Sequence, residues 1–111
     1  MTMAEHLTPP TPLVQLTQAD FEALPGGALI WQGLADLEAG KRSVATLLID
    51  IARPRLTELG IVPHSAPPAV AEPERELYQR LRGEPGDAYS RYNALIRELI
   101  SFQAALIRMS R

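Results

Sequence analysis

The sequence predicts an all-α fold: a small helical bundle of about four helices with a kinked second helix, a long C-terminal helix and a disordered N-terminal tail. Three observations support this prediction. Apolar residues recur at helical spacing, capping residues and glycines bracket those stretches, and only 5% of the residues are aromatic. A chain of 111 residues is long enough for one core. We therefore expect a flexible tail over residues 1–16 and a single helical domain over residues 17–111.

The N-terminal elements are predicted from prolines, glycines and caps. Residues 1–16 contain three prolines, which disfavour a helix. Thr17 begins a capping-box pattern that predicts a short helix ending before Pro25. A longer helix is expected over residues 28–39, where apolar residues have helical spacing and Gly40 follows in the position of a left-handed C-cap.

The second long helix is expected to begin after the N-cap Ser43, to contain a kink and to end at Gly60. Pro54 lies inside it, removes a backbone hydrogen bond and clashes with the preceding turn, so a bend is expected near Arg53. In an uninterrupted helix Arg55 would share the face of Leu48, and a charge there needs a partner. Two interpretations follow: an anion-binding arginine at the kink, or a structural ion pair.

The C-terminal half is predicted to be a helical hairpin. A proline-rich linker, residues 62–71, separates it from the first half. Pro73 and Gly83 bracket a third helix, and Asp87 caps a final helix that runs to Met109, about 33 Å at 1.5 Å per residue. Apolar residues cover about half of the circumference of this last helix, more than one neighbour covers. We therefore expect it at the centre of the bundle.

Composition narrows the functional classes. The chain has no cysteine, so it has neither disulfides nor a thiolate nucleophile. The first 20 residues carry no Lys or Arg and no apolar run, which excludes a typical signal peptide, and no stretch approaches the ~20 apolar residues of a membrane span. The sequence therefore favours a protein without membrane contact, and the absence of cysteine makes a bacterial-type cytoplasm the default expectation.

No sequence motif indicates a catalytic, metal-binding or phosphate-binding site. His6 and His64 lack metal-ligand spacing, and the glycines after Pro25 lack the lysine and the preceding strand of a phosphate loop. Lys41 and Arg42 precede a helix too apolar to read DNA, which makes a nucleic-acid partner improbable. We expect no catalytic residue, no metal and no cofactor. The sequence leans against an enzyme without deciding the question.

Two functional hypotheses remain. The first is a non-catalytic helical interaction module that forms a homo-oligomer, most simply a homodimer, through the C-terminal helix, or that binds another protein. Its candidate interface residues are Trp31, Leu95, Leu99, Phe102 and Leu106. The second is a small-molecule or anion-binding protein with an arginine-containing pocket near the Pro54 kink. Its candidate ligand-binding residues are Arg53, Arg55, Arg91 and Tyr92.

Overall fold

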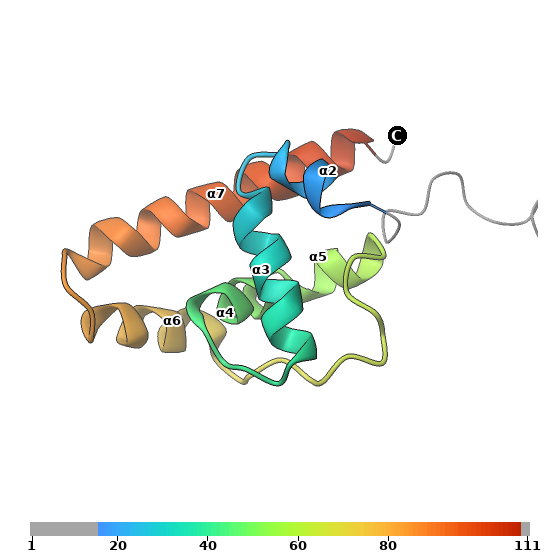
Figure 1. The fold of residues 1–111 in the computed structure, drawn as a ribbon. Helices are drawn as coiled ribbons and strands as arrows, with labels where there is room; N and C mark the ends of the chain where they lie inside the picture. Colours follow the sequence, from blue (N-terminus) through green and yellow to red (C-terminus); the bar gives the residue numbers. More distant parts are fainter. Residues whose placement is uncertain (1–15, 110–111) are drawn as a thin grey trace, which may run out of the picture.

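The computed structural model describes residues 16–109, and this part of the chain is all-helical (Figure 1). The predicted fold class is confirmed. The tail predicted for residues 1–16 lies, except for its last residue, outside the described residues. The described range contains six helices, which are α2 (Gln18–Glu22), α3 (Gly27–Glu38), α4 (Val44–Ile51), α5 (Arg53–Glu58), α6 (Pro73–Arg82) and α7 (Ala88–Met109).

The predicted N-caps begin α2 and α4. The Thr17 hydroxyl accepts a hydrogen bond from the backbone N–H of Asp20 (3.2 Å), whose carboxylate accepts one from the N–H of Thr17 (2.9 Å). At α4 the Ser43 hydroxyl accepts from the N–H of Thr46 (3.2 Å), and the Thr46 hydroxyl accepts from the N–H of Ser43 (2.8 Å). Each reciprocal pair satisfies backbone donors that a helix start leaves without partners.

Two helices end with the same glycine motif. Gly40 follows α3 with a φ of 75°, and the N–H of Lys41 donates to the carbonyl of Asp36 (2.8 Å). Gly60 follows α5 with a φ of 83°, and Ile61 makes the equivalent bond back into that helix. Glycine adopts this left-handed conformation without a steric penalty, so the chain reverses where the sequence predicts.

The bend predicted at Pro54 is a complete break. Helix α4 ends at Ile51, and α5 begins only after Ala52, whose φ of −96° and ψ of 13° are not helical. Before the break Leu48 is fully buried, whereas after it the side chain of Arg55 is 48% exposed. The expectation that Arg55 shares the face of Leu48 is therefore wrong, because it assumed an uninterrupted helix.

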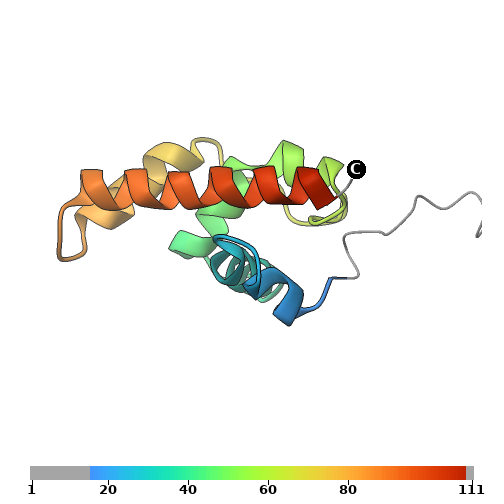
Figure 2. The ribbon, with the colours of Figure 1, turned by 90° about the horizontal axis from the view of Figure 1, so that it is seen from above.

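Helix α4, rather than α7, lies at the centre of the fold. It packs against α3, α5, α6 and α7, and residues 45–49 are buried in succession, which requires cover on every side. Helix α7 is buried at Phe102 and open at Ile100; seen from above, it passes in front of α4 and α6, while α2 and α3 lie to one side of it (Figure 2). The expectation of a central C-terminal helix is thus wrong, because its apolar arc is divided between the core and the surface.

Helices α3 and α4 approach each other closely at Gly33. A Cβ atom at this position would lie 2.6 Å from the backbone oxygen of Ala45 and 2.8 Å from Cγ1 of Ile49. No side chain larger than hydrogen fits that space unless the helices separate. Gly33 therefore sets the distance between the two helices.

Asp36 fixes the turn between the same two helices. Its carboxylate accepts hydrogen bonds from the Ser43 hydroxyl (2.8 Å) and from Nε2 of Gln32 (2.9 Å), and Nζ of Lys41 lies 3.9 Å away. The hydrogen bond from Ser43 is the largest cause that lowers the pKa of Asp36 below its ordinary value of 3.8; partial burial opposes it, and Gln32 and Lys41 add to it. The charged carboxylate thus holds the start of α4 against the end of α3.

Replacing Gly33 by alanine should destabilise the protein by about 1–3 kcal/mol, although alanine is the better helix former, because the added methyl group overlaps α4. Chemical denaturation followed by circular dichroism measures this change. Gly83→Ala is the matched control, since its nearest contact would be 3.5 Å away. Equal stability of Gly33→Ala and the wild type would show that the close approach does not constrain the fold.

Replacing Asp36 by asparagine should destabilise the protein at pH 7, and the difference from the wild type should shrink as the pH falls. The folded pKa of Asp36 is depressed, so its contribution is complete above about pH 4 and is lost as the pH falls through the folded pKa. Urea titrations at several pH values test this. Glu38→Gln removes the same charge from an exposed neighbour; if it reproduces the pH dependence, the effect does not come from the hydrogen bonds of Asp36.

Candidate functional site

The most accessible apolar surface of the described residues lies on α7, which carries two stripes. The inner stripe holds Leu99, Phe102 and Leu106, which are 0–3% exposed. The outer stripe includes Tyr89 and Ile100, whose exposed fractions are 65% and 58%. The wide apolar arc predicted for this helix is therefore divided: the inner stripe belongs to the core, and the outer stripe faces the surface.

The outer stripe follows the spacing of a coiled-coil seam. Tyr89, Asn93, Ile96 and Ile100 are separated by four, three and four residues, the alternation that relates the a and d positions of a heptad. In this register Asn93 occupies an a position, where a single asparagine fixes the alignment of paired helices. Ile96 and Asn93 are half-buried, whereas Ile100 stands clear of the body. The face thus offers side chains suited to a second helix.

Three of the five predicted interface residues are not on the surface. Leu99, Phe102 and Leu106 lie in the core, so they cannot meet a partner unless the fold opens. Leu95 is half-buried, beside the turn that precedes α3. Trp31 is half-buried, with its ring edge-on to the ring of Phe21 at a centroid distance of 5.1 Å. Both stripes share the same spacing of four, three and four residues, so the spacing does not distinguish the covered stripe from the open one.

The predicted ligand-binding arginine at the break is engaged within the chain. Nη1 of Arg53 donates to the Asp50 carboxylate (3.0 Å), and Nη2 donates to the carbonyl of Pro67. The second carboxylate oxygen of Asp50 accepts from the N–H of Val70 (3.4 Å). The side chains of Arg53 and Asp50 are only 15% and 8% exposed. This pair therefore ties the break between α4 and α5 to the proline-rich linker.

The other three predicted ligand-binding residues do not join Arg53 in a common pocket. Arg55 lies at the surface, with its Nε 3.4 Å from the carboxylate of Glu58. Arg91 donates to the carboxylate of Glu84 (2.9 Å), near the start of α7. Tyr92 lines a different pocket from Arg55, against Tyr78 of α6. The structure does not bring the four residues together.

Tyr92 belongs to an aromatic contact between α6 and α7. Its ring meets that of Tyr78 nearly at right angles, at a centroid distance of 5.9 Å. Partial burial, followed by repulsion from the carboxylate of Glu74, raises the pKa of Tyr92. The phenol therefore stays neutral at physiological pH and serves this contact, without the properties of an acid–base group.

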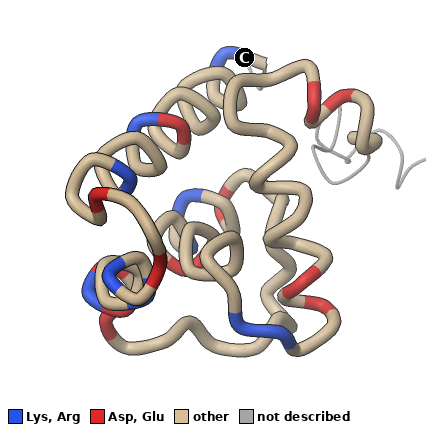
Figure 3. Tube along the Cα trace, turned by 60° about the vertical axis from the view of Figure 1, so that its left-hand side comes forward, with Lys and Arg blue, Asp and Glu red and all other residues tan. Residues whose placement is uncertain are grey.

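Lys41 and Arg42, which lie in the turn between α3 and α4, also have partners within the chain. Nη1 of Arg42 donates to the carboxylate of Glu76 (2.8 Å), and Lys41 approaches Asp36. Basic and acidic positions are mixed on α6, and the arginines of α7 are spread along its length, with Glu98 beside Arg97 (Figure 3). A strip of cations for a phosphate backbone is therefore not found among residues 16–109. None of the described helices is long and apolar enough to span a bilayer.

Comparisons with known proteins do not assign this chain to a family. No protein-family model, no curated protein and no solved structure matches it. The functional argument therefore depends on the chemistry and placement of the described residues.

Arg53→Ala should destabilise the protein by about 2–4 kcal/mol, because Asp50 would keep a nearly buried charge without its counter-ion. Arg55→Ala should change stability by no more than about 0.5 kcal/mol, as is usual for an exposed ion pair. Thermal melting of both variants gives the comparison, and limited proteolysis should detect faster cleavage of the proline-rich linker in Arg53→Ala. Unchanged melting and cleavage of Arg53→Ala would refute its structural role.

Proposed function

We propose that this chain is a non-catalytic helical interaction module that self-associates through the outer stripe of α7. The observation that carries the proposal is the exposure of Ile100 (58%) in line with Tyr89 on a helix whose opposite side is packed. Exposing large apolar side chains along one line of a helix is costly unless a partner covers them. Two copies would supply matching faces, since the same stripe can pair about a two-fold axis.

The size of the stripe sets the strength of the proposed dimer. Helix α7 is 22 residues long, so one of its faces measures about 33 by 10 Å, or roughly 350 Å². A stable interface usually buries about 800 Å² on each partner. Self-association should therefore be weak and concentration-dependent, with a dissociation constant in the micromolar range or above.

The alternative, a small-molecule or anion-binding protein, has less support. Arg53 already binds the Asp50 carboxylate and a linker carbonyl, and Arg55 and Tyr92 line separate pockets. A ligand anion would have to displace a buried carboxylate from Arg53. A cytoplasmic, bacterial setting remains part of the proposal, supported by the absence of cysteine in the whole sequence.

Ile100→Glu should shift the monomer–dimer equilibrium by at least about tenfold toward the monomer, because burying an unpaired carboxylate in a helix pair is unfavourable. Its Tm at low concentration should stay close to that of the wild type, since Ile100 is exposed. Sedimentation velocity over roughly 1–500 µM measures the equilibrium. Ser101→Glu is the control, because it adds the same charge at the neighbouring exposed position.

Two results would contradict the proposal. One is a wild-type protein that stays monomeric throughout this concentration range. The other is an equal effect of Ile100→Glu and Ser101→Glu, which would indicate that net charge, not the apolar stripe, controls association.

A further inference from the structure

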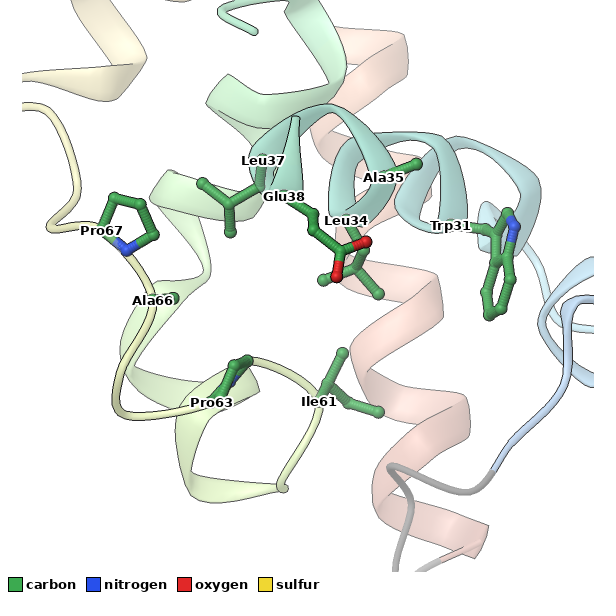
Figure 4. A pocket seen from close by; sticks show the side chains of 9 residues that line it. All are labelled: Trp31, Leu34, Ala35, Leu37, Glu38, Ile61, Pro63, Ala66 and Pro67. Atoms are coloured by element: carbon green, nitrogen blue, oxygen red, sulfur yellow. The ribbon is translucent and has the colours of Figure 1, made fainter. Parts of the chain in front are cut away.

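An apolar groove of about 460 Å³ lies between α3 and the segment of residues 61–67 (Figure 4). Leu34 and Leu37 form the α3 wall, and Ile61 and Pro63 form the opposite wall. Trp31 stands at one end. The carboxylate of Glu38 is the one charged group of the lining, so the groove suits an apolar occupant with few polar atoms.

Both walls of the groove are held by contacts elsewhere. The α3 wall is fixed by the close approach of Gly33 to α4. The opposite wall is fixed where Ile61 enters the core at 7% exposure and where the Pro67 carbonyl accepts from Arg53. The groove is therefore formed before any occupant arrives, which lowers the free-energy cost of binding.

We propose that this groove binds residues 7–15 of the same chain. This segment reads Leu-Thr-Pro-Pro-Thr-Pro-Leu-Val-Gln and lies immediately before the described range. Its three prolines have no backbone N–H, so fewer donors would lose water without gaining a partner in the apolar groove. Prolines also restrict the unbound segment, which lowers the entropy lost on binding, and Leu13 and Val14 supply apolar side chains.

The position of the segment along the chain supports binding within one molecule. Leu16, the first described residue, is half-buried against the core, and Phe21 of α2 contacts Trp31 at one end of the groove. Nine residues at about 3.1 Å each can span about 28 Å. The α3 wall from Trp31 to Glu38 rises only about 10 Å. The segment is therefore long enough to follow the groove.

The covalent connection favours this occupant over others. A short linker gives a tethered segment an effective concentration in the millimolar range. A second copy of the chain or another proline-rich peptide would have to reach that concentration to compete. Binding within one molecule should thus be independent of protein concentration, and it does not depend on whether α7 pairs with another copy.

The test uses the full chain and its single tryptophan, Trp31, as the probe. In the double variant L13D/V14D, Trp31 emission should shift to the red and its acrylamide quenching constant should rise about twofold, because carboxylates would keep the segment out of the apolar groove. The control T2D/A4D adds the same charges before the segment and should match the wild type. Ala66→Arg, on the wall opposite α3, should reproduce the effect of L13D/V14D.

Each outcome decides the proposal. Unchanged Trp31 quenching in L13D/V14D, with an unchanged Tm, overturns it, as does an equal change in T2D/A4D. Protection of wild-type Trp31 that is equal at about 1 and 200 µM supports binding within one molecule. Protection that appears only at the higher concentration overturns it in favour of a second copy. Ile100→Glu should leave the quenching unchanged, which separates this result from self-association through α7.

Discussion

The close approach of α3 to α4 at Gly33 is the constraint on which the rest of the fold depends. With the two backbones in contact there, α4 is buried on the side of α3, and its remaining sides are covered by α6 and α7. Asp36 adds a polar contact at the end of the same pair, where it binds Ser43. The central position of α4 follows from this helix pair, whereas the break after it occurs at Pro54 and Arg53 holds the proline-rich linker.

Features that depend on a few neighbouring residues could be predicted from the sequence. The capping box at Thr17, the N-cap Ser43 and the left-handed glycines Gly40 and Gly60 are confirmed, since each involves only three to six consecutive residues. The position of α4 at the centre could not be predicted in this way. It depends on a glycine contact between helices, and a sequence pattern shows the glycine but not the neighbour that requires it.

At the candidate site, too, the sequence predicts the features of one helix but not which of its sides the other helices cover. The apolar arc of α7 was visible in the sequence, but its separation into an inner stripe with Phe102 and an outer stripe with Ile100 depends on which side α4 and α6 cover. The break at Ala52 also altered the environment of Arg55. An uninterrupted helix would have turned this side chain inward, whereas the real chain exposes it and assigns the buried charge contact to Arg53.

The two simultaneous contacts of Arg53 limit which residues could replace it during evolution. One planar guanidinium binds a carboxylate from α4 and, at the same time, the carbonyl of a linker residue 14 positions after it in the sequence. Lysine carries the same charge but lacks the fixed fork that spans two acceptors. An exchange of this arginine for lysine during evolution would therefore loosen the wall of the groove that Pro67 lines.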